Sequence, residues 1–225
     1  MCDHGEAGSE SEPAFAVAAP LPKDTALWLI RHGETEWSRD GRHTSRTDLP
    51  LTSYGEDQAR ALSPLLAELR PALVLSSPRQ RAVRTAELAG LPIDGIDPDI
   101  AEWDYGEYEG LTTPQIRQHD PGWSVFTHPS PGGETAAEVS ARADRVLTRV
   151  IPSLSTGPVV LVAHGHISRV IGARWIGLRA RDGARLALGV AAPSVLGAEH
   201  GRSVILHWNM PVTAARAALT RSPGG

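Results

Sequence analysis

Three apolar runs that end in polar residues constrain the fold of this chain more than any other feature of its sequence. The longest, Pro158–Ala163, leads directly into His164. The other two are Ala26–Ile30 and Ala72–Leu75. A strand that is apolar without alternation is typical of a sheet whose two faces are both covered. The runs therefore predict buried strands of a mainly parallel sheet.

Helical stretches follow the first two runs. Ser53 and Glu56 match a capping box at the start of one helix, and Pro64 is expected to kink or split that helix. The next helix is predicted to begin with Ser77 as its N-cap and Pro78 as its first residue.

The second half of the chain continues the alternation of strands and helices. A helix is predicted from Thr135, another follows His164 as far as about Trp175, and closing strands are expected near 194–199 and 203–208. Such alternation is typical of a mainly parallel sheet with helices on both faces. The predicted fold is a three-layer α/β/α sandwich.

Length and composition suggest one domain of residues 25–210, between a flexible N-terminal tail of residues 1–24 and a C-terminal tail of residues 211–225. The net charge of -4 argues against nucleic acid as a partner. The single cysteine, Cys2, can build neither a disulfide framework nor a thiolate cluster. With an acidic start unlike a secretory signal and no long apolar run, we expect no membrane partner and a cytoplasmic location.

The chemistry is expected where the strands end, because ligands of open α/β sheets bind at the carboxyl ends of the strands. Arg31 and His32 follow the first strand, Arg81 lies shortly after the second, and His164 follows the third. Guanidinium groups fit a phosphate monoester, and a neutral imidazole can attack its phosphorus. A carboxylic acid between residues 97 and 109 would protonate the leaving oxygen.

Two other readings of these residues are weaker. A metal site at His164 and His166 has only H-x-H spacing and no third ligand that stands out in the sequence. A nucleotide-binding loop is excluded because the sequence contains no G-x-x-x-x-G-K-[ST] motif.

Several motifs together resemble the histidine phosphatase superfamily, in its phosphoglycerate-mutase-like branch. The match covers roughly residues 26–208, and its motifs occur in the family's order. They are Leu29-Ile30-Arg31-His32-Gly33-Glu34-Thr35-Glu36-Trp37, Leu51-Thr52-x-x-Gly55, Ser77-Pro78-x-x-Arg81-Ala82-x-x-Thr85-Ala86, Glu102-x-x-Tyr105-Gly106-x-x-Glu109-Gly110, Gly132-Gly133-Glu134-Thr135 and His164-Gly165.

The resemblance implies a role for each matching residue. It assigns His32 as the nucleophile, Glu102 as the general acid, and His164 as a catalytic residue of the phosphate pocket. It implies no metal and no organic cofactor. It also assigns residues that bind the phosphate of the substrate, namely Arg31, Arg81, Ser38, Thr44, Ser45 and Gly165.

Departures from the family's pattern favour hydrolysis over mutase activity. Trp103 stands where the mutases carry an arginine for the substrate carboxylate, and their paired middle arginines have no counterpart between residues 111 and 131. The region around Glu102 resembles a subset with acid phosphatases and sugar-phosphate phosphatases. We therefore expect a small-molecule phosphate ester as substrate, with a mutase and a silent phospho-ligand binding module as alternatives. Pairing of two copies through the closing strands stays open.

Overall fold

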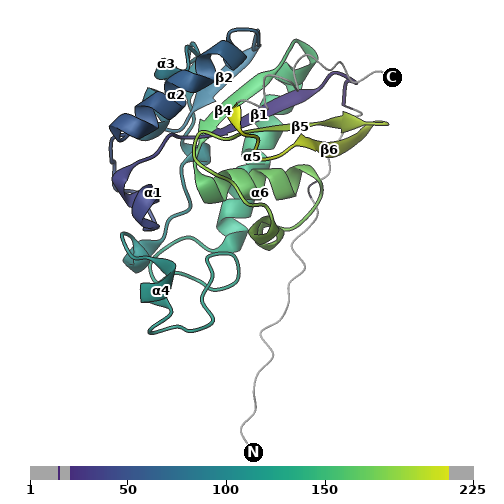
Figure 1. Ribbon diagram of the computed structural model, residues 1–225. Coiled ribbons are helices and arrows are strands. Elements are labelled where there is room, and N and C mark those ends of the chain that lie inside the picture. The colour runs from purple at the N-terminus through teal and green to yellow at the C-terminus, as the bar shows by residue number, and fades with distance from the viewer. Residues whose placement is uncertain (1–14, 16–20, 213–225) are drawn as a thin grey trace, which may run out of the picture.

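A six-stranded sheet forms the centre of the molecule, in the computed structural model that describes Phe15 and residues 21–212 (Figure 1). The strand order is β3-β2-β4-β1-β5-β6. Strands β1 to β4 run parallel, and β5 pairs antiparallel with both β1 and β6. The bounds are β1 Ala26–Arg31, β2 Leu73–Ser76, β3 Gly95–Ile96, β4 Val159–Ala163, β5 Pro193–Glu199 and β6 Arg202–His207.

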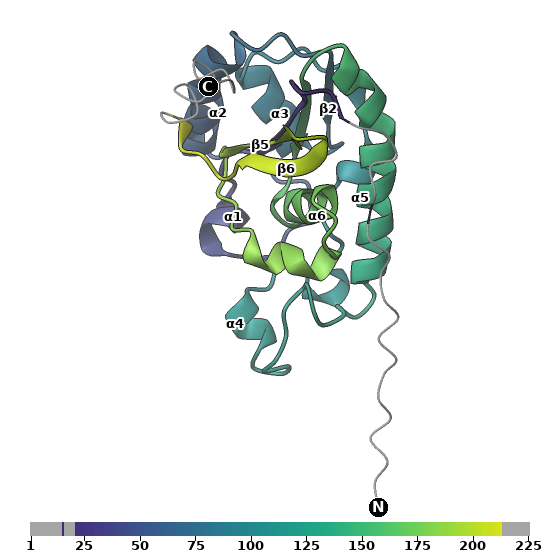
Figure 2. The same cartoon turned by 90° about the vertical axis from the view of Figure 1, so that its right-hand side faces the viewer.

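Helices cover both faces of the sheet, as the two views show (Figures 1 and 2). Helices α2 and α3 lie on one face, and α5 and α6 lie on the other. The α-helices are α1 Glu36–Asp40, α2 Ser53–Leu66, α3 Gln80–Leu88, α4 Thr113–Ile116, α5 Ala136–Val150 and α6 Gly165–Trp175. Short 3-10 helices are η1 Pro98–Ile100, η2 Gly106–Tyr108, η3 Ile151–Ser155 and η4 Ala180–Arg185.

Strand β4 shows why the sheet is covered on both sides. All of its residues are buried, and Val159 and Leu161 join the hydrophobic cluster that contains α5 and α6. Val160 and Val162 point the other way, into the cluster that contains α2 and α3. Successive side chains of a strand face opposite ways, so an all-apolar strand requires two apolar layers. The predicted three-layer α/β/α sandwich is confirmed.

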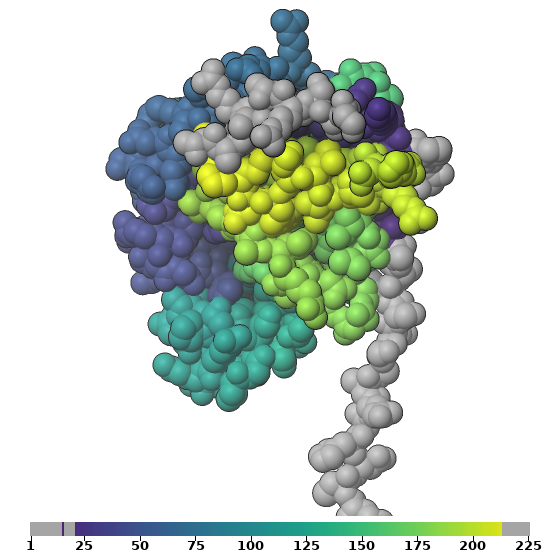
Figure 3. Space-filling model, turned by 45° about the vertical axis from the view of Figure 1, so that its right-hand side comes forward, coloured from purple at the N-terminus to yellow at the C-terminus, as the bar shows by residue number. Residues whose placement is uncertain are grey.

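The topology opens a crevice at the carboxyl ends of β1 and β4. These two strands are neighbours, but the chain leaves β1 toward α2 and leaves β4 toward α6, on opposite faces. The connection between β3 and α5, which carries η1, η2 and α4, lies beyond this end of the sheet (Figure 1). Part of it appears as the teal lower end of the space-filling view (Figure 3). Such a switch point is where open α/β sheets bind ligands.

Three local predictions need correction. Helix α2 is capped by Thr52, whose hydroxyl accepts the N–H of Gly55, one residue before the predicted cap. The helix is not split at Pro64, which lies in its last turn, where little of the helix remains to be disrupted. Helix α3 starts at Gln80 with Arg79 as its N-cap, and the hydroxyl of Ser77 contacts both His164 and the N–H of Arg79.

The predicted tails lie mostly outside the described residues, as does Cys2. Leu21, which falls within the predicted N-terminal tail, is buried in the cluster that contains α5 and α6. Within the part of the chain that the structure describes, no helix has the length and apolar character needed to cross a membrane.

Candidate active site

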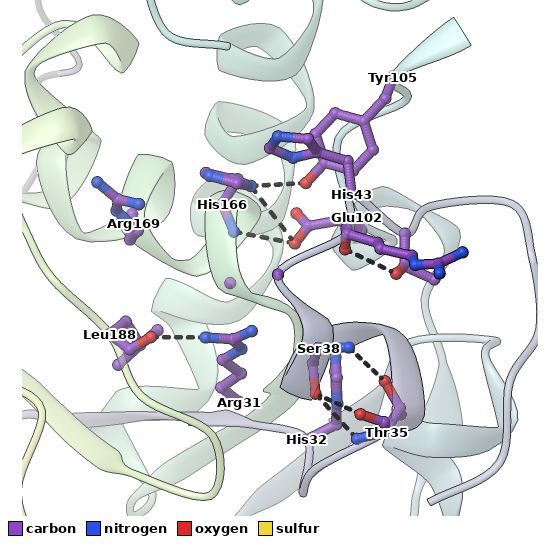
Figure 4. A pocket seen from close by; sticks show the side chains of 14 residues that line it. Arg31, His32, Thr35, Ser38, His43, Glu102, Tyr105, His166, Arg169 and Leu188 are labelled. Atoms are coloured by element: carbon purple, nitrogen blue, oxygen red, sulfur yellow. Dashed lines mark hydrogen bonds and ion pairs between the residues drawn. The ribbon is translucent and has the colours of Figure 1, made fainter. Parts of the chain in front are cut away.

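A pocket of about 150 Å³ lies at the crevice predicted by the topology (Figure 4). Its walls come from the end of β1, from α1, from the first turns of α6, and from the loops around residues 41–44, 102–105 and 188. Six residues predicted for the site line it, namely Arg31, His32, Ser38, Thr44, Glu102 and Gly165. Ser45, Arg81 and His164 do not line it but are buried behind it.

His32 lies directly after β1, where its N–H still donates to the carbonyl of Ala163 at the end of β4. Its Nδ1 is 2.7 Å from the carbonyl oxygen of Gly33. A carbonyl can only accept, so Nδ1 carries the proton and the lone pair of the neutral ring is on Nε2. Burial, with the charges of Arg81 and Arg31, lowers the pKa of His32 well below 6.5. The imidazole is therefore held in the form that can attack.

Two glycines fix the chain just after His32. A β-carbon at Gly33 would lie 2.3 Å from the carbonyl oxygen of Gly55, and one at Gly55 would lie 2.1 Å from that of Glu34. Only residues without side chains allow this close approach. The contact explains why glycines occur in both sequence motifs: it docks the loop after His32 onto the start of α2.

Arg31 supplies a cation beside His32. Its Nη1 donates to the carbonyl of Leu188 at 2.7 Å, while its buried Nε has no hydrogen-bond partner among the described residues. A buried donor without a partner is costly, and an anion in the pocket would relieve that cost. A β-carbon at Gly165 would lie 3.3 Å from Cζ of Arg31 and 3.6 Å from Oε2 of Glu102, so glycine leaves this space open.

Glu102 is held by backbone N–H groups at the start of α6. Its Oε1 accepts from Ile167 and from Trp103, each at 2.9 Å, and its Oε2 accepts from the N–H of His166 at 3.0 Å. The start of a helix favours a carboxylate in this way. Since Oε2 accepts a single N–H, it retains capacity for a proton on the pocket side.

The loop that carries Glu102 is anchored to α5. Arg142 forms a two-bond ion pair with Glu134 and also donates to the carbonyls of Asp99 and Ala101. Glu134 does not cap α5, since that role belongs to Thr135. The loop therefore reaches the pocket from a fixed base.

His164 and Arg81 form a layer behind His32. The rings of His32 and His164 lie 5.1 Å apart between centroids. Arg81 donates from Nε to Nδ1 of His164 at 3.2 Å, so Nε2 of the neutral ring carries the proton and donates to Ser77 at 2.7 Å. Burial first, then Arg81, lowers the pKa of His164 well below 6.5.

The predicted small polar residues differ in what they contact. Thr44 lines the pocket. Ser38 also lines it, but its hydroxyl accepts from the N–H of Thr35 and donates to the carbonyl of the same residue. Ser45 points away, because its hydroxyl and its N–H donate to Glu109. The structure thus brings Ser38 and Thr44 to the pocket and turns Ser45 from it.

Comparison with known proteins agrees with this geometry. The family model of the histidine phosphatase superfamily (branch 1) matches residues 27–211 of this chain. The chain belongs to this superfamily. An acid phosphatase of Mycobacterium tuberculosis is 46% identical over 177 residues, which are 78% of this chain and 87% of that protein. The family and its phosphatase relatives make this chain a histidine phosphatase, that is, a phosphoric monoester hydrolase.

Further relatives support the same class and fold. Sedoheptulose 1,7-bisphosphatase of Saccharomyces cerevisiae is 32% identical over 181 residues, 67% of each chain. The solved structure of an open reading frame product from Mycobacterium tuberculosis superposes with a TM-score of 0.82 at 43% identity, covering 84% of this chain and 99% of that one. A mycobacterial glucosyl-3-phosphoglycerate phosphatase, solved with VO3, gives a TM-score of 0.73 at 28% identity and covers 83% and 100%.

Sequence reasoning missed one wall of this histidine phosphatase's pocket. His43, Tyr105, His166 and Arg169 line it opposite the Arg31 side (Figure 4). Tyr105 Oη and His166 Nδ1 are 2.6 Å apart, and the rings of His43 and Tyr105 lie 4.7 Å apart. Burial lowers the pKa of His43 to about 4, partly offset by Glu109. One signal was available, since Arg169 follows Gly165 by four residues on one helix face.

The H-x-H pair does not form a metal site. His164 contacts Arg81 and Ser77, whereas His166 contacts Tyr105. Among the described residues, no three or more His, Cys, Asp or Glu side chains are grouped so that they could hold a metal ion. The two histidines thus serve different walls of the site.

Proposed function

We propose that this phosphatase is a metal-independent phosphomonoesterase that hydrolyses a small phosphorylated metabolite through a phosphohistidine intermediate. The observation that carries the proposal is the placement of His32 Nε2 in a pocket shared with Arg31 and Glu102. Nucleophile, cation and acid thereby face one cavity, as phosphoryl transfer requires.

In the first step, Nε2 of His32 attacks the phosphorus of the ester. The N–P bond forms as the bond from phosphorus to the leaving oxygen breaks. Glu102, in its protonated form, gives its proton from Oε2 to that oxygen, and the alcohol leaves. Arg31 binds the phosphoryl oxygens, and Arg81 adds positive charge from behind His164.

In the second step, water attacks the phosphorus of phosphohistidine. The Glu102 carboxylate accepts a proton from the water, the N–P bond breaks, and its electron pair returns to Nε2 of His32. Inorganic phosphate leaves, and both His32 and Glu102 regain their starting forms. The arginines stay charged throughout, so they can stabilise both transition states without titrating.

The substrate class rests on relatives and on the pocket wall. Three of the relatives carry the names acid phosphatase, sedoheptulose 1,7-bisphosphatase and glucosyl-3-phosphoglycerate phosphatase. Neutral imidazoles at His43 and His166, beside the Tyr105 phenol, offer hydrogen bonds suited to hydroxyl groups. These features favour a sugar phosphate or a similar hydroxylated ester.

The test is phosphate release from a panel of sugar, glycerate and nucleoside phosphates in excess EDTA, with wild type and His32→Ala compared. We expect the variant to lose turnover by roughly 10⁴-fold or more, as for other removed nucleophiles. Brief reaction with labelled substrate should phosphorylate only the wild type, in an acid-labile bond. Activity retained by His32→Ala would refute the mechanism, and faster interconversion than hydrolysis of phosphoglycerates would favour a mutase.

A further inference from the structure

Glu109 follows Glu102 in the motif Glu102-x-x-Tyr105-Gly106-x-x-Glu109-Gly110, and the proposed mechanism does not use it. Its carboxylate lies under the loop of residues 44–47 and accepts only from that loop in the contacts described. The N–H of Ser45 lies 2.9 Å from both oxygens, the Ser45 hydroxyl lies 2.8 Å from Oε2, and the N–H of Thr47 lies 3.0 Å from Oε1. The carboxylate thus fixes the loop by accepting hydrogen bonds from the loop's N–H and hydroxyl groups.

The same loop holds Arg81 by its acceptors. Nη1 of Arg81 donates to the carbonyl of Thr47 at 2.9 Å, and Nη2 donates to those of Thr44 at 3.2 Å and Ser45 at 3.3 Å. Arg81 is fully buried, so the direction of its guanidinium is set by these carbonyls and by His164. The carbonyl groups of this loop therefore hold the Arg81 guanidinium in place behind the proposed nucleophile.

One peptide group connects the two charges directly. The carbonyl of Thr44 accepts from Arg81, and the N–H of Ser45, in the same peptide unit, donates to Glu109. A carboxylate at one end and a guanidinium at the other polarise that unit in the same direction, so each hydrogen bond strengthens the other. Thr44 also lines the pocket, so the bridged unit reaches the substrate side as well.

We propose that Glu109 is a positioning residue for phosphate binding, which orients Arg81 and Thr44 through the Thr44–Ser45 peptide group. The inference rests on the proposed function, in which Arg81 stabilises charge on the transferred phosphoryl group. Glu109 does not itself line the pocket, so it reaches Arg81 and Thr44 through the loop, while its charge also acts on His43 of the pocket wall. Loss of the carboxylate releases the loop, and the guanidinium then loses its fixed direction.

The deciding variant is Glu109→Gln, which keeps the shape but puts an amide donor where the loop needs an acceptor. Glu107→Gln is the matched control. Glu107 lies two residues before Glu109 and is exposed, so this substitution removes the same charge without touching the loop. We expect kcat/KM of Glu109→Gln to fall by about 10²-fold, the scale of a small misplacement of catalytic groups. Inhibition by orthovanadate, in buffer without EDTA, should weaken by a similar factor. Glu107→Gln should match the wild type in both.

Vanadate separates positioning from a purely structural role. A variant that is merely less stable would melt earlier yet bind vanadate normally while folded, and that result would overturn the inference. So would equal behaviour of Glu109→Gln and Glu107→Gln. If Glu109→Gln does not fold, Glu109→Asp replaces it: the shorter carboxylate should also weaken vanadate binding, and unchanged binding overturns the inference.

The proposed function and this inference fail in different ways. If the wild type hydrolyses no ester in EDTA, or His32→Ala stays active, the proposed function fails. Vanadate binding by calorimetry still compares Glu109→Gln with Glu107→Gln in that case. If hydrolysis depends on His32 but vanadate binding ignores Glu109, only the positioning role is lost.

Discussion

The two ends of the active-site pocket are built in different ways. At the end where we propose that phosphate binds, the phosphate end, main-chain groups fix the side chains of the proposed mechanism: Gly33 orients His32, Leu188 binds Arg31, and the start of α6 holds Glu102. At the other end, the leaving-group end, side chains of α6 contact side chains from the connection between β3 and α5. Tyr105 lies 2.6 Å from His166, and Phe126 lies under the guanidinium of Arg169 at 4.6 Å.

We infer that this difference separates the groups that act on phosphorus from the groups that select the alcohol part of the substrate. Groups that react with phosphorus must be held to a fraction of an ångström, and backbone hydrogen bonds provide that precision. The opposite wall needs only to fit the alcohol part of the ester. Its side chains can change without disturbing the strand ends that carry Arg31 and His32 (Figure 4). We therefore expect large effects at one end, uniform for Arg31 and His32 and dependent on the leaving group for Glu102, and small effects that vary with the alcohol part at the other.

After the loss of His32, the largest expected effect is that of Glu102→Gln, which removes the proton donor but keeps the side chain's size. We expect kcat/KM for an alkyl phosphate to fall by roughly 10²–10⁴-fold, the usual contribution of general acid catalysis. An aryl phosphate, whose leaving group needs no proton, should lose much less in the phosphorylation step. Steady-state and burst kinetics on the two esters measure this contrast.

Glu107→Gln is the control for Glu102→Gln, since Glu107 is an exposed carboxylate of the same segment. An equal loss on both esters would show that Glu102 does not protonate the leaving oxygen. The phosphate end would then lack an identified acid, and the division between the two ends would need revision.

A second effect concerns pH and the charge of Arg31. Protonation removes the attacking lone pair, so activity falls as the pH drops through the pKa of His32. Burial and the two arginines lower that pKa well below 6.5, so the acid limb of kcat/KM should lie well below pH 6.5. In Arg31→Gln one of these charges is gone, so the limb should move toward 6.5. The rate should also fall by roughly 10²–10³-fold, as for other lost transition-state contacts.

Variant and wild type are compared on the same substrate. The ionisation of the ester then affects both acid limbs equally, and the difference between the two limbs reports on the enzyme. Arg60→Gln serves as control, because Arg60 is an exposed arginine that pairs with Glu56 and Asp57 on α2. An acid limb that stays in place in Arg31→Gln would show that Arg31 does not act on His32. The phosphate end would then not behave as one electrostatic unit.

The sequence predicted the phosphate end because strand ends and motif residues are local signals. Buried apolar runs located β1 and β4, and the parallel arrangement then brought His32 and His164 together. It failed where a side chain had competing partners. Ser77 looked like a helix cap but contacts His164, and Ser45 looked like a phosphate ligand but contacts Glu109.

The leaving-group end could not be predicted in the same way. His43 and Tyr105 come together only after loops from distant parts of the chain fold over the crevice, next to Arg169 on α6. None of these loops has a regular apolar period that would fix its position in advance. Leu188 carries no chemical signal in the sequence at all, yet its carbonyl binds Arg31.

The smallest predicted effect is that of Tyr105→Phe at the leaving-group end. The hydroxyl group is lost while the ring stays, so His166 loses the 2.6 Å hydrogen bond between its Nδ1 and that hydroxyl. A neutral hydrogen bond contributes about 0.5–1.5 kcal/mol, which corresponds to at most about a tenfold change in kcat/KM. The change should differ among sugar and aryl phosphates in the panel, with vanadate inhibition unaltered. A uniform loss of about 10²-fold, with weaker vanadate binding, would place Tyr105 in the phosphate machinery, because groups that act on the phosphoryl group affect every ester alike.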